Sequence, residues 1–231
     1  MASTSGTVGR KVRPSDRAPA KAADDPRQLR ARALADVRRE LVLDAARSAF
    51  FELGIDKTSI REVAQRAGYT PGAIYSYFAS KEEMYGALLG ESLDRLNDRV
   101  RRSAEASDEG VPRLRAAARA FFEFYLANPR DLDLGFYLFQ GMKPRGLTPE
   151  LNDALNARLL QALQPCRDEL RRLGMPAAAA LQEVTALFAH AMGLLVLSHT
   201  GRIRMFRQDS AGLFRRYLDQ LVERAGAHEG S

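Results

Sequence analysis

The feature that most constrains the fold is a pair of helix signals within residues 59–78. The first residue of this segment is a serine, and Glu62 follows three positions later, the pattern of a capping box that satisfies the free amides of a first helical turn. Gly68 ends that helix, and Thr70 with Pro71 begins the next one, because proline is tolerated at the first helical position. We therefore predict two short helices separated by a glycine turn.

Helix signals continue on both sides of this segment. Apolar residues at 42, 45, 46, 49, 50 and 53 repeat with the spacing of one helix face, and Gly54 follows as a stop. Residues 80–83 form a second capping box, which opens a long helix towards residue 106. Further along, Pro112, Pro149 and Pro176 lie near predicted helix starts, and no alternating strand pattern occurs. The fold class that we predict is all-α.

Composition excludes several classes of protein. The chain has 231 residues, of which 45% are hydrophobic, enough for a small domain and a larger one with its own core. The single cysteine, Cys166, cannot form an internal disulfide and has no neighbouring histidine in the sequence. Because the chain also lacks a Gly-rich phosphate loop and a nucleophile elbow, we expect no enzymatic activity, no metal site and no cofactor.

The sequence also bears on the cellular compartment. No apolar stretch follows the basic N-terminus, so we expect no signal peptide. The longest apolar run, residues 184–198, contains His190 and is too short to span a bilayer, so we interpret it as a buried helix. The expected location is cytoplasmic, with no membrane partner.

The positive charge is concentrated at the N-terminus. Residues 1–40 contain ten Lys or Arg and five Asp or Glu, which leaves a net charge of +1 out of the total of +6 for the rest of the chain. Residues 1–33 are rich in small and charged residues and have few large apolar ones, so we predict a disordered basic arm. The arm either binds a polyanionic partner or only makes the chain more soluble, and the sequence leaves both alternatives open.

The second short helix has an unusual outer face. On a helical wheel Ile74 and Phe78 point inward, whereas Gly72, Ala73 and Ser76 point outward. Such a face is poor surface for a protein core, but its low relief lets a helix approach base edges in the DNA major groove. The alternative is a helical hairpin that serves only in packing.

Residues 42–89 read VLDAARSAFFELGIDKTSIREVAQRAGYTPGAIYSYFASKEEMYGALL and resemble the N-terminal domain of the tetracycline-repressor (TetR) family. The A-x-x-x-F-x-x-x-G run, the T-S-hydrophobic-R-E-hydrophobic-A stretch and the Y-x-Y-F-x-S-K-E-E segment recur in order and without a gap. The resemblance covers about a fifth to a quarter of the chain. It implies a helix-turn-helix in which the residues that face operator DNA are Thr70, Pro71, Gly72, Ala73, Tyr75, Ser76 and Tyr77, with Ser59 and Lys81 at the DNA backbone.

The predicted DNA-binding segment, residues 41–90, which we call the reader, is not basic. It contains five Lys or Arg and six Asp or Glu, a net charge of −1. Phosphate contacts must therefore come from a few cations such as Lys81, from helix N-termini and from the basic arm. Because the outer face lacks Arg, Asn and Gln, we expect sequence to be read through thymine methyl groups and DNA shape.

The domain boundaries follow from these patterns and from the resemblance. We predict an arm at residues 1–33, a three-helix helix-turn-helix domain at 34–90, a helical bundle for ligand sensing and dimerisation at 91–226, and a tail at 227–231. The resemblance implies a homodimer and a near-palindromic operator.

Two sets of residues are candidates for the roles of the second domain. Aromatic and polar side chains mixed into apolar segments favour a ligand pocket over an ordinary core, and that pocket is predicted to be lined by Phe121, Phe122, Tyr125, Phe136, Tyr137, Gln140, Thr185 and His190. The lone histidine of this set is more typical of an interior group than of a metal ligand. The long apolar stripes of the last two helices predict a dimer interface of Leu187, Ala191, Leu194, Leu195, Phe214, Tyr217, Leu218 and Leu221.

Together these patterns predict a dimeric, sequence-specific DNA-binding regulator. The main hypothesis is a repressor that a small, largely apolar effector releases from its operator, with the long helix after Ser80 as the lever. The alternative is a constitutive or activating DNA-binding regulator without a small-molecule ligand.

Overall fold

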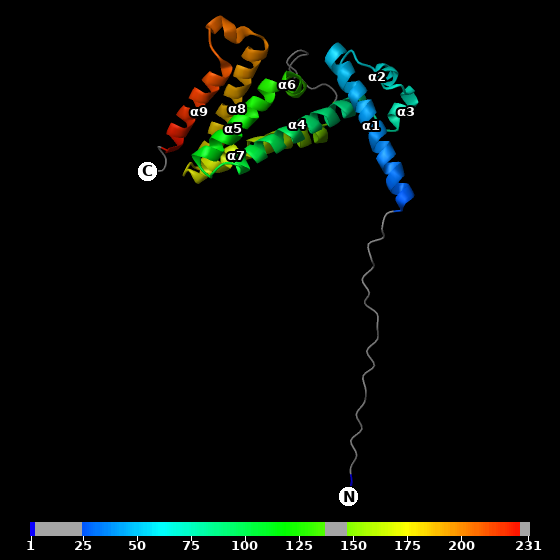
Figure 1. Cartoon of the computed structure of the whole chain (residues 1–231), viewed down its shortest axis with the longest axis horizontal. Coiled ribbons are helices and arrows are strands. Elements are labelled where there is room, and N and C mark those ends of the chain that lie inside the picture. Colours follow the sequence, from blue (N-terminus) through cyan, green and yellow to red (C-terminus); the bar gives the residue numbers. More distant parts are fainter. Residues whose placement is uncertain (3–24, 137–146, 227–231) are drawn as a thin grey trace. The chain divides into compact units, whose positions relative to one another are not determined.

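The structure is a computed structural model that describes residues 1–2, 25–136 and 147–226. Its contacts divide the chain into two units, Met1–Arg38 and Arg39–Ser231. All regular elements in the described residues are helices, as Figure 1 shows, so the predicted all-α class is confirmed.

The first helix is longer than the sequence pattern predicts. α1 spans Pro26–Leu53, and Gly54, with a φ of 84°, ends it in the left-handed region. The helical assignment of residues 26–33 corrects the prediction of disorder for that part of the arm; residues 3–24 lie outside the described residues. The reason is that Ala, Arg and Leu have high helix propensity and extend an existing helix without a nucleation cost, even though their side chains are exposed.

The two short helices form where the caps predict them. α2 (Ile60–Ala67) begins after Ser59, whose Oγ accepts a hydrogen bond from the Glu62 amide at 3.2 Å. Its end is set by Gly68, which adopts a φ of 71° and places its amide on α2 carbonyls. α3 (Pro71–Tyr75) starts after Thr70, whose Oγ1 accepts from the Ala73 amide at 3.2 Å. Both predicted caps are confirmed, but α3 ends three residues before Phe78.

A compact core holds these helices in place. Leu43 of α1, Val63 of α2 and Ile74 of α3 are fully buried, and Phe78, after α3, is 1% exposed. Met84 from the following helix completes this cluster. The inward positions predicted for Ile74 and Phe78 are therefore confirmed.

The rest of the described chain is a bundle of long helices. These are α4 (Lys81–Glu105), α5 (Val111–Ala127), α6 (Pro129–Phe136), α7 (Pro149–Arg172), α8 (Ala177–His199), the short 3-10 helix η1 (Arg202–Phe206) and α9 (Ser210–Gly226). α4, α5 and α7 pack against one another, and α8 packs against α9, as can be followed in Figure 1. α4 runs without interruption through residue 90, where the domain boundary was predicted.

α8 differs from the other long helices in its composition. It has 23 residues and a mean hydropathy of 1.6 over its most apolar window, so by length and composition alone it could cross a membrane. The core helix of a folded domain passes the same test. Within the single chain, only 33% of this apolar part of α8 is buried. The prediction of a buried helix is therefore corrected, and much of the apolar surface of α8 is uncovered.

Candidate nucleic-acid interface

The outer face of α3 is small and exposed, as the wheel predicts. Gly72 and Ser76 are exposed and Ala73 is partly exposed, whereas Ile74 between them is fully buried. A Cβ atom placed on Gly72 would meet no other heavy atom within 4 Å. The face therefore has open space in front of it and low relief, the two properties that close approach to base edges requires.

Two tyrosines flank this face in different ways. Tyr75 is 58% exposed, whereas Tyr77 is partly buried and packs against the hydrophobic core. Between them the Ser76 hydroxyl donates to the Ala73 carbonyl at 2.6 Å, so its hydrogen is used inside the helix and its lone pairs are left to accept. The hydroxyl of Tyr75 is the more accessible donor for a phosphate.

Lys81 lies at the start of α4, but its ammonium group turns towards the segment between α1 and α2. Nζ donates to the carbonyls of Ile55 at 2.7 Å, Asp56 at 3.3 Å and Thr58 at 3.2 Å. An ammonium group has three donors, and these contacts use all of them. The phosphate contact that the resemblance implies for Lys81 stays a prediction. A phosphate oxygen would have to replace one of these carbonyl acceptors.

The same segment is anchored to α1 by a buried threonine. Thr58 is 2% exposed, and its Oγ1 lies 2.7 Å from the Gly54 carbonyl and 3.2 Å from that of Ala49. A buried hydroxyl of this kind is costly to replace, because its carbonyl partners would lose a buried donor. Thr58 thus fixes the turn that precedes the cap of α2.

Two cations of α1 and α2, Arg47 and Arg66, are paired with acids. Arg66 contacts Glu62 at 2.7 Å and also Glu52, and these hydrogen bonds raise the pKa of its guanidinium above its usual value. Arg47 pairs with Asp44 and with Glu91 of α4. These pairs neutralise two of the five cations in residues 41–90, a segment whose net charge is already negative.

Arg39 is a cation held against the reader itself. Its guanidinium carbon lies 4.7 Å from the centroid of the Phe78 ring, a cation–π contact. The side chain is 41% exposed, and its ion pair with Glu40 is long, at 3.6 Å. A guanidinium is therefore positioned at the end of the segment that carries α3 while it stays accessible to an anion.

The candidate pocket residues of the second domain do not all come together. Phe121, Tyr125 and Phe136 join Phe188 in an aromatic cluster, with ring centroids 5.4–6.1 Å apart. Burial raises the pKa of the Tyr125 hydroxyl, which keeps it neutral as a hydrogen-bonding group.

The other predicted pocket residues lie elsewhere or outside the described chain. Phe122 stacks on Phe214 of α9 at 4.3 Å, and His190 stacks on Tyr217 at 4.2 Å. Thr185 is exposed, and its hydroxyl donates to a carbonyl one turn earlier in α8. Tyr137 and Gln140 fall outside the described residues. The structure thus brings three of the eight predicted pocket residues into one cluster, Phe121, Tyr125 and Phe136.

For most predicted interface residues the structure corrects the prediction. Seven of them are no more than 6% exposed within the single chain and belong to its core: Leu187, Ala191, Leu194, Leu195, Phe214, Leu218 and Leu221. Only Tyr217 of that set reaches the surface. The physical reason is that an apolar stripe at helical spacing fits a core and an interface equally well.

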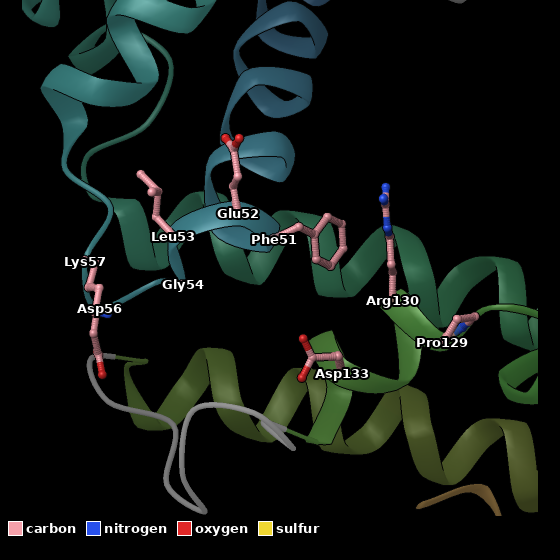
Figure 2. Close-up of a pocket in the computed structure, with 9 residues that line it drawn as sticks. All are labelled: Phe51, Glu52, Leu53, Gly54, Asp56, Lys57, Pro129, Arg130 and Asp133. Carbon is pink, nitrogen blue, oxygen red and sulfur yellow. The ribbon is translucent and has the colours of Figure 1, made fainter. Parts of the chain in front are cut away.

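A cleft separates the end of α1 from α6. It has a volume of about 700 Å³, and Figure 2 shows Phe51 of α1 across from Arg130 and Asp133 of α6. The Arg130 guanidinium carbon lies 5.4 Å from the Phe51 ring centroid. On α4, the buried hydroxyl of Tyr85 donates to the Leu134 carbonyl of α6. Contacts from α6 therefore reach both α1 and α4.

Cys166 has no features of a catalytic nucleophile. It is fully buried, and burial raises the pKa of its thiol to about 12, so the thiolate is scarce near neutral pH. Within the described ranges, no group of three or more His, Cys, Asp or Glu side chains could hold a metal ion.

Sequence reasoning missed several residues that shape the site. No sequence pattern indicates that Arg39 packs on Phe78, and Thr58 enters only as part of the T-S motif of the resemblance. Phe188 and Tyr85 were not named among the candidate residues, because their partners are 49–67 positions away in the chain. The signal that could have found Tyr85 is its polar hydroxyl on the apolar helix face that also carries Leu88 and Leu89.

Two family models match this chain. The model of bacterial regulatory proteins of the tetR family matches residues 42–88, and that of the tetracyclin repressor-like C-terminal domain matches residues 114–221. The first match contains α2, α3 and the start of α4. The second contains the aromatic cluster and most of α8 and α9.

Curated relatives share the N-terminal part. The chain is 38% identical over 89 residues to the transcriptional activator FasR of Mycolicibacterium smegmatis. This alignment covers 38% of this chain and 41% of FasR. It is 38% identical over 86 residues to the transcriptional repressor KstR2 of Mycobacterium tuberculosis, covering 37% of this chain and 43% of KstR2. The chain thus spans less than half the length of these relatives.

Solved structures share the fold over most of the chain. The putative regulatory protein SCO4313 aligns with a TM-score of 0.68 and 22% identity, covering 83% of this chain and 97% of that one. The transcriptional regulator FadR of Bacillus subtilis, solved in complex with stearoyl-CoA, aligns with a TM-score of 0.60 and 19% identity, covering 79% and 97%. At these identities the likeness concerns the fold.

Proposed function

This chain belongs to the TetR family of DNA-binding transcriptional regulators, a non-enzymatic class, and we propose that it acts as a cytoplasmic homodimer on a near-palindromic operator. The observation that carries the proposal is the outer face of α3, which is exposed and built from Gly72, Ala73 and Ser76 over a fully buried Ile74. A face of this kind serves neither a core nor a well-solvated surface, and it fits the major groove.

We assign the DNA contacts to α3 and to the helix N-termini beside it. The small residues of α3 lie against base edges, Tyr75 donates to a phosphate, and Ser59 brings the N-terminus of α2 to the DNA backbone. The full set that we propose is Ser59, Thr70, Pro71, Gly72, Ala73, Tyr75, Ser76, Tyr77 and Lys81. Arg39 and the basic residues of α1 before it supply phosphate contacts that the reader lacks.

This assignment is tested on a duplex selected from a randomised library. Tyr75→Ala should weaken binding by about 1–3 kcal/mol, because a charge-assisted hydrogen bond to phosphate is lost while an exposed side chain leaves the fold unchanged. Fluorescence anisotropy measures the affinity, and circular dichroism checks the helicity. Leu160→Ala on α7, which is 63% exposed, is the matched control. Full affinity of the Tyr75 variant would overturn its role.

The proposed dimer surface is the uncovered face of α8 with its neighbour α9. Small residues repeat along the exposed side of α8 at Ala186, Ala189 and Gly193, a spacing that lets two helices approach closely. Nearby, His190 Nε2 is buried but has no hydrogen-bond partner within the described part of the chain. A second copy would cover the apolar face and provide a partner for this atom.

A charged side chain on this face tests the dimer. Ala189→Arg should leave the single chain folded, because this position is exposed, but should convert the dimer to a monomer in light scattering after size exclusion. DNA affinity should fall with it, since two half-sites can no longer be bound together. Leu160→Arg on α7 is the control. A variant at Ala189 that remains dimeric would move the interface elsewhere.

For the effector we propose a small, largely apolar molecule at the aromatic cluster. Phe121, Phe136 and Phe188 supply apolar rings, and the neutral hydroxyl of Tyr125 supplies an orienting group. That FadR of Bacillus subtilis was solved with stearoyl-CoA makes long acyl chains the first probes. A thermal-shift series of fatty acids and acyl-CoA thioesters should raise the melting temperature, and the same compounds should release DNA.

The route from effector to DNA runs through α6 in this proposal. Phe136 at the end of α6 belongs to the aromatic cluster, and the Leu134 carbonyl accepts the bond from Tyr85 on α4. A ligand that displaces Phe136 would thus shift α4 and change the spacing of the two readers.

The second candidate function is a constitutive or activating DNA-binding regulator without a small-molecule ligand. The activating alternative is supported by the similarity to the transcriptional activator FasR. Absence of any stabilising compound would favour a regulator without a ligand.

A further inference from the structure

The groove between α4 and α5 gathers several arginines and belongs to none of the sites described above. Its volume is about 800 Å³. The arginines that line it are Arg95, Arg99, Arg102 and Arg119. We propose that this groove binds a small molecule that carries a diphosphate, such as a nucleoside diphosphate. The proposal goes beyond DNA binding and gives the chain a second ligand site, apart from the aromatic cluster.

The arginines come from both walls of the groove. Arg95, Arg99 and Arg102 follow the i, i+4, i+7 spacing of one helix face on α4, and they are spread over roughly 10 Å along the helix axis. Arg119 belongs to α5, the other wall. A single phosphate is too small to contact cations over this length, whereas a diphosphate with a nucleoside attached is long enough. The spacing therefore favours an extended phosphorylated ligand.

Positive charge exceeds negative charge along the groove. Against the four guanidinium groups, two carboxylates line it, those of Asp98 and Glu123, which leaves a net charge of +2. Glu123 is shared by two arginines, with Arg99 at 3.7 Å and Arg119 at 3.4 Å. Because one carboxylate cannot neutralise two guanidinium groups, the groove attracts a further anion.

Most ion pairs of the groove are open to exchange. Asp98 lies 3.6 Å from Arg102, so this pair, like those of Glu123, is longer than the roughly 2.7–2.9 Å of a charge-assisted hydrogen bond. The four arginine side chains are 53–73% exposed, and exposed ion pairs are weak. Arg95 is held more closely, by Asp131 of α6 at 2.5 Å, and counting this acid still leaves a net charge of +1. Phosphate oxygens can therefore replace the long pairs.

The other lining residues suit the nucleoside part of such a ligand. Ala116 and Ala120 of α5 are small, and Phe124 adds apolar surface, although it is only 8% exposed. Guanidinium planes stack on aromatic rings, so a base can lie between the arginines and this apolar part. The Asn128 side chain donates to the Phe124 carbonyl at 2.7 Å, which leaves its amide oxygen to accept from the ligand.

DNA is a less suitable occupant of this groove. Arg95 and Arg102 follow the first residue of α4 by 14 and 21 positions, which corresponds to roughly 21–32 Å along the helix. The proposed DNA contacts lie on α3 and at the helix N-termini beside it, including the start of α4. A dissolved anion can reach the groove, whereas the backbone of an operator held by α3 would have to extend along most of α4.

Isothermal titration calorimetry of the full chain at low salt tests the site with ADP, inorganic pyrophosphate and adenosine. We expect ADP and pyrophosphate to bind once per chain and adenosine not to bind, because the phosphates supply the charged contacts. Tighter binding of ADP would show that the apolar part takes the nucleoside, and equal affinities would show that the diphosphate suffices. If neither phosphorylated probe bound, or if adenosine alone bound, the proposal would be overturned.

Variants that change the charge in opposite directions locate the binding. Arg99→Gln combined with Arg119→Gln should weaken ADP binding roughly tenfold or more, because two charge-assisted contacts are lost. Glu123→Gln should strengthen it, since both arginines lose the acid that competes with the ligand. Arg101→Gln is the matched control, because Arg101 is also on α4 but lines a different groove, beside α7, and should retain the wild-type affinity. An equal loss in the control would reveal nonspecific attraction and refute the site.

DNA binding by the same variants separates the two functions. The slope of log K against log salt should be the same for the wild type and the Arg99 and Arg119 double variant. A slope flattened by about 0.9 for each arginine would assign them to DNA phosphates and contradict the ligand site. A wild-type chain that failed to bind DNA would refute the proposed function, whereas the ADP titration, which contains no DNA, would still test the groove.

Discussion

Replacing Gly72 with alanine should separate folding from DNA binding. Gly72 is the second residue of α3, it lacks the positive φ that would require glycine, and a Cβ atom there meets nothing within 4 Å. Alanine therefore fits the free protein without strain and restricts the unfolded chain. The free energy of unfolding should rise by about 0.4–1 kcal/mol, which chemical denaturation followed by circular dichroism can measure.

On DNA the same methyl group should be harmful. If the face of α3 lies against base edges, the added carbon must displace atoms in a closely packed contact, which costs about 1–3 kcal/mol. That cost corresponds to an affinity roughly fivefold to 150-fold weaker in fluorescence anisotropy. Gly226→Ala at the end of α9, where a Cβ atom also meets nothing, is the matched control. A Gly72 variant that binds as tightly as the wild type would refute the placement of this face in the groove.

Three further predictions concern other parts of the chain. Thr58→Val should lower the free energy of unfolding by about 1–3 kcal/mol in urea denaturation, because two carbonyls lose a buried donor, whereas Thr58→Ser should retain most of the stability. Arg39→Ala should flatten the salt slope of DNA binding by about 0.9 if its guanidinium meets a phosphate, and an unchanged slope would limit Arg39 to packing on Phe78. Burial lowers the pKa of His190, so its contribution to stability is complete above the unfolded pKa of about 6.5 and is lost as the pH falls through the lower folded value. Melting temperatures between pH 7.5 and 5 should therefore fall more for the wild type than for His190→Gln, and parallel curves would exclude this role.

The reader could be predicted from the sequence because its determinants are local. Ser59 and Thr70 cap helices through amides three residues away, and Gly68 ends α2 by its own backbone conformation. Such signals depend on a few neighbouring residues, so they survive without knowledge of the fold. The buried positions of Ile74 and Phe78 follow in the same way from helical periodicity.

The errors arise where the outcome depends on distant contacts. Leu194 and Phe214 lie on apolar stripes, and periodicity cannot distinguish a stripe that packs in the chain's own core from one that meets a second copy. The bonds of Lys81 depend on carbonyls in another loop, which no local pattern describes. The start of α1 at Pro26 escaped prediction because an exposed Ala- and Arg-rich segment carries no burial signal, although its helix propensity is high.

The central claim is that two copies of this chain read DNA together through α3. Selection of bound duplexes from a randomised library, followed by sequencing, tests it most directly. The claim predicts an enriched near-palindromic motif whose half-sites lie one helical turn, about 34–36 Å, or a whole multiple of it apart. Loss of that enrichment with Ala189→Arg would follow from the need for a dimer. Recovery of no motif, or of a motif without two-fold symmetry, would contradict the claim.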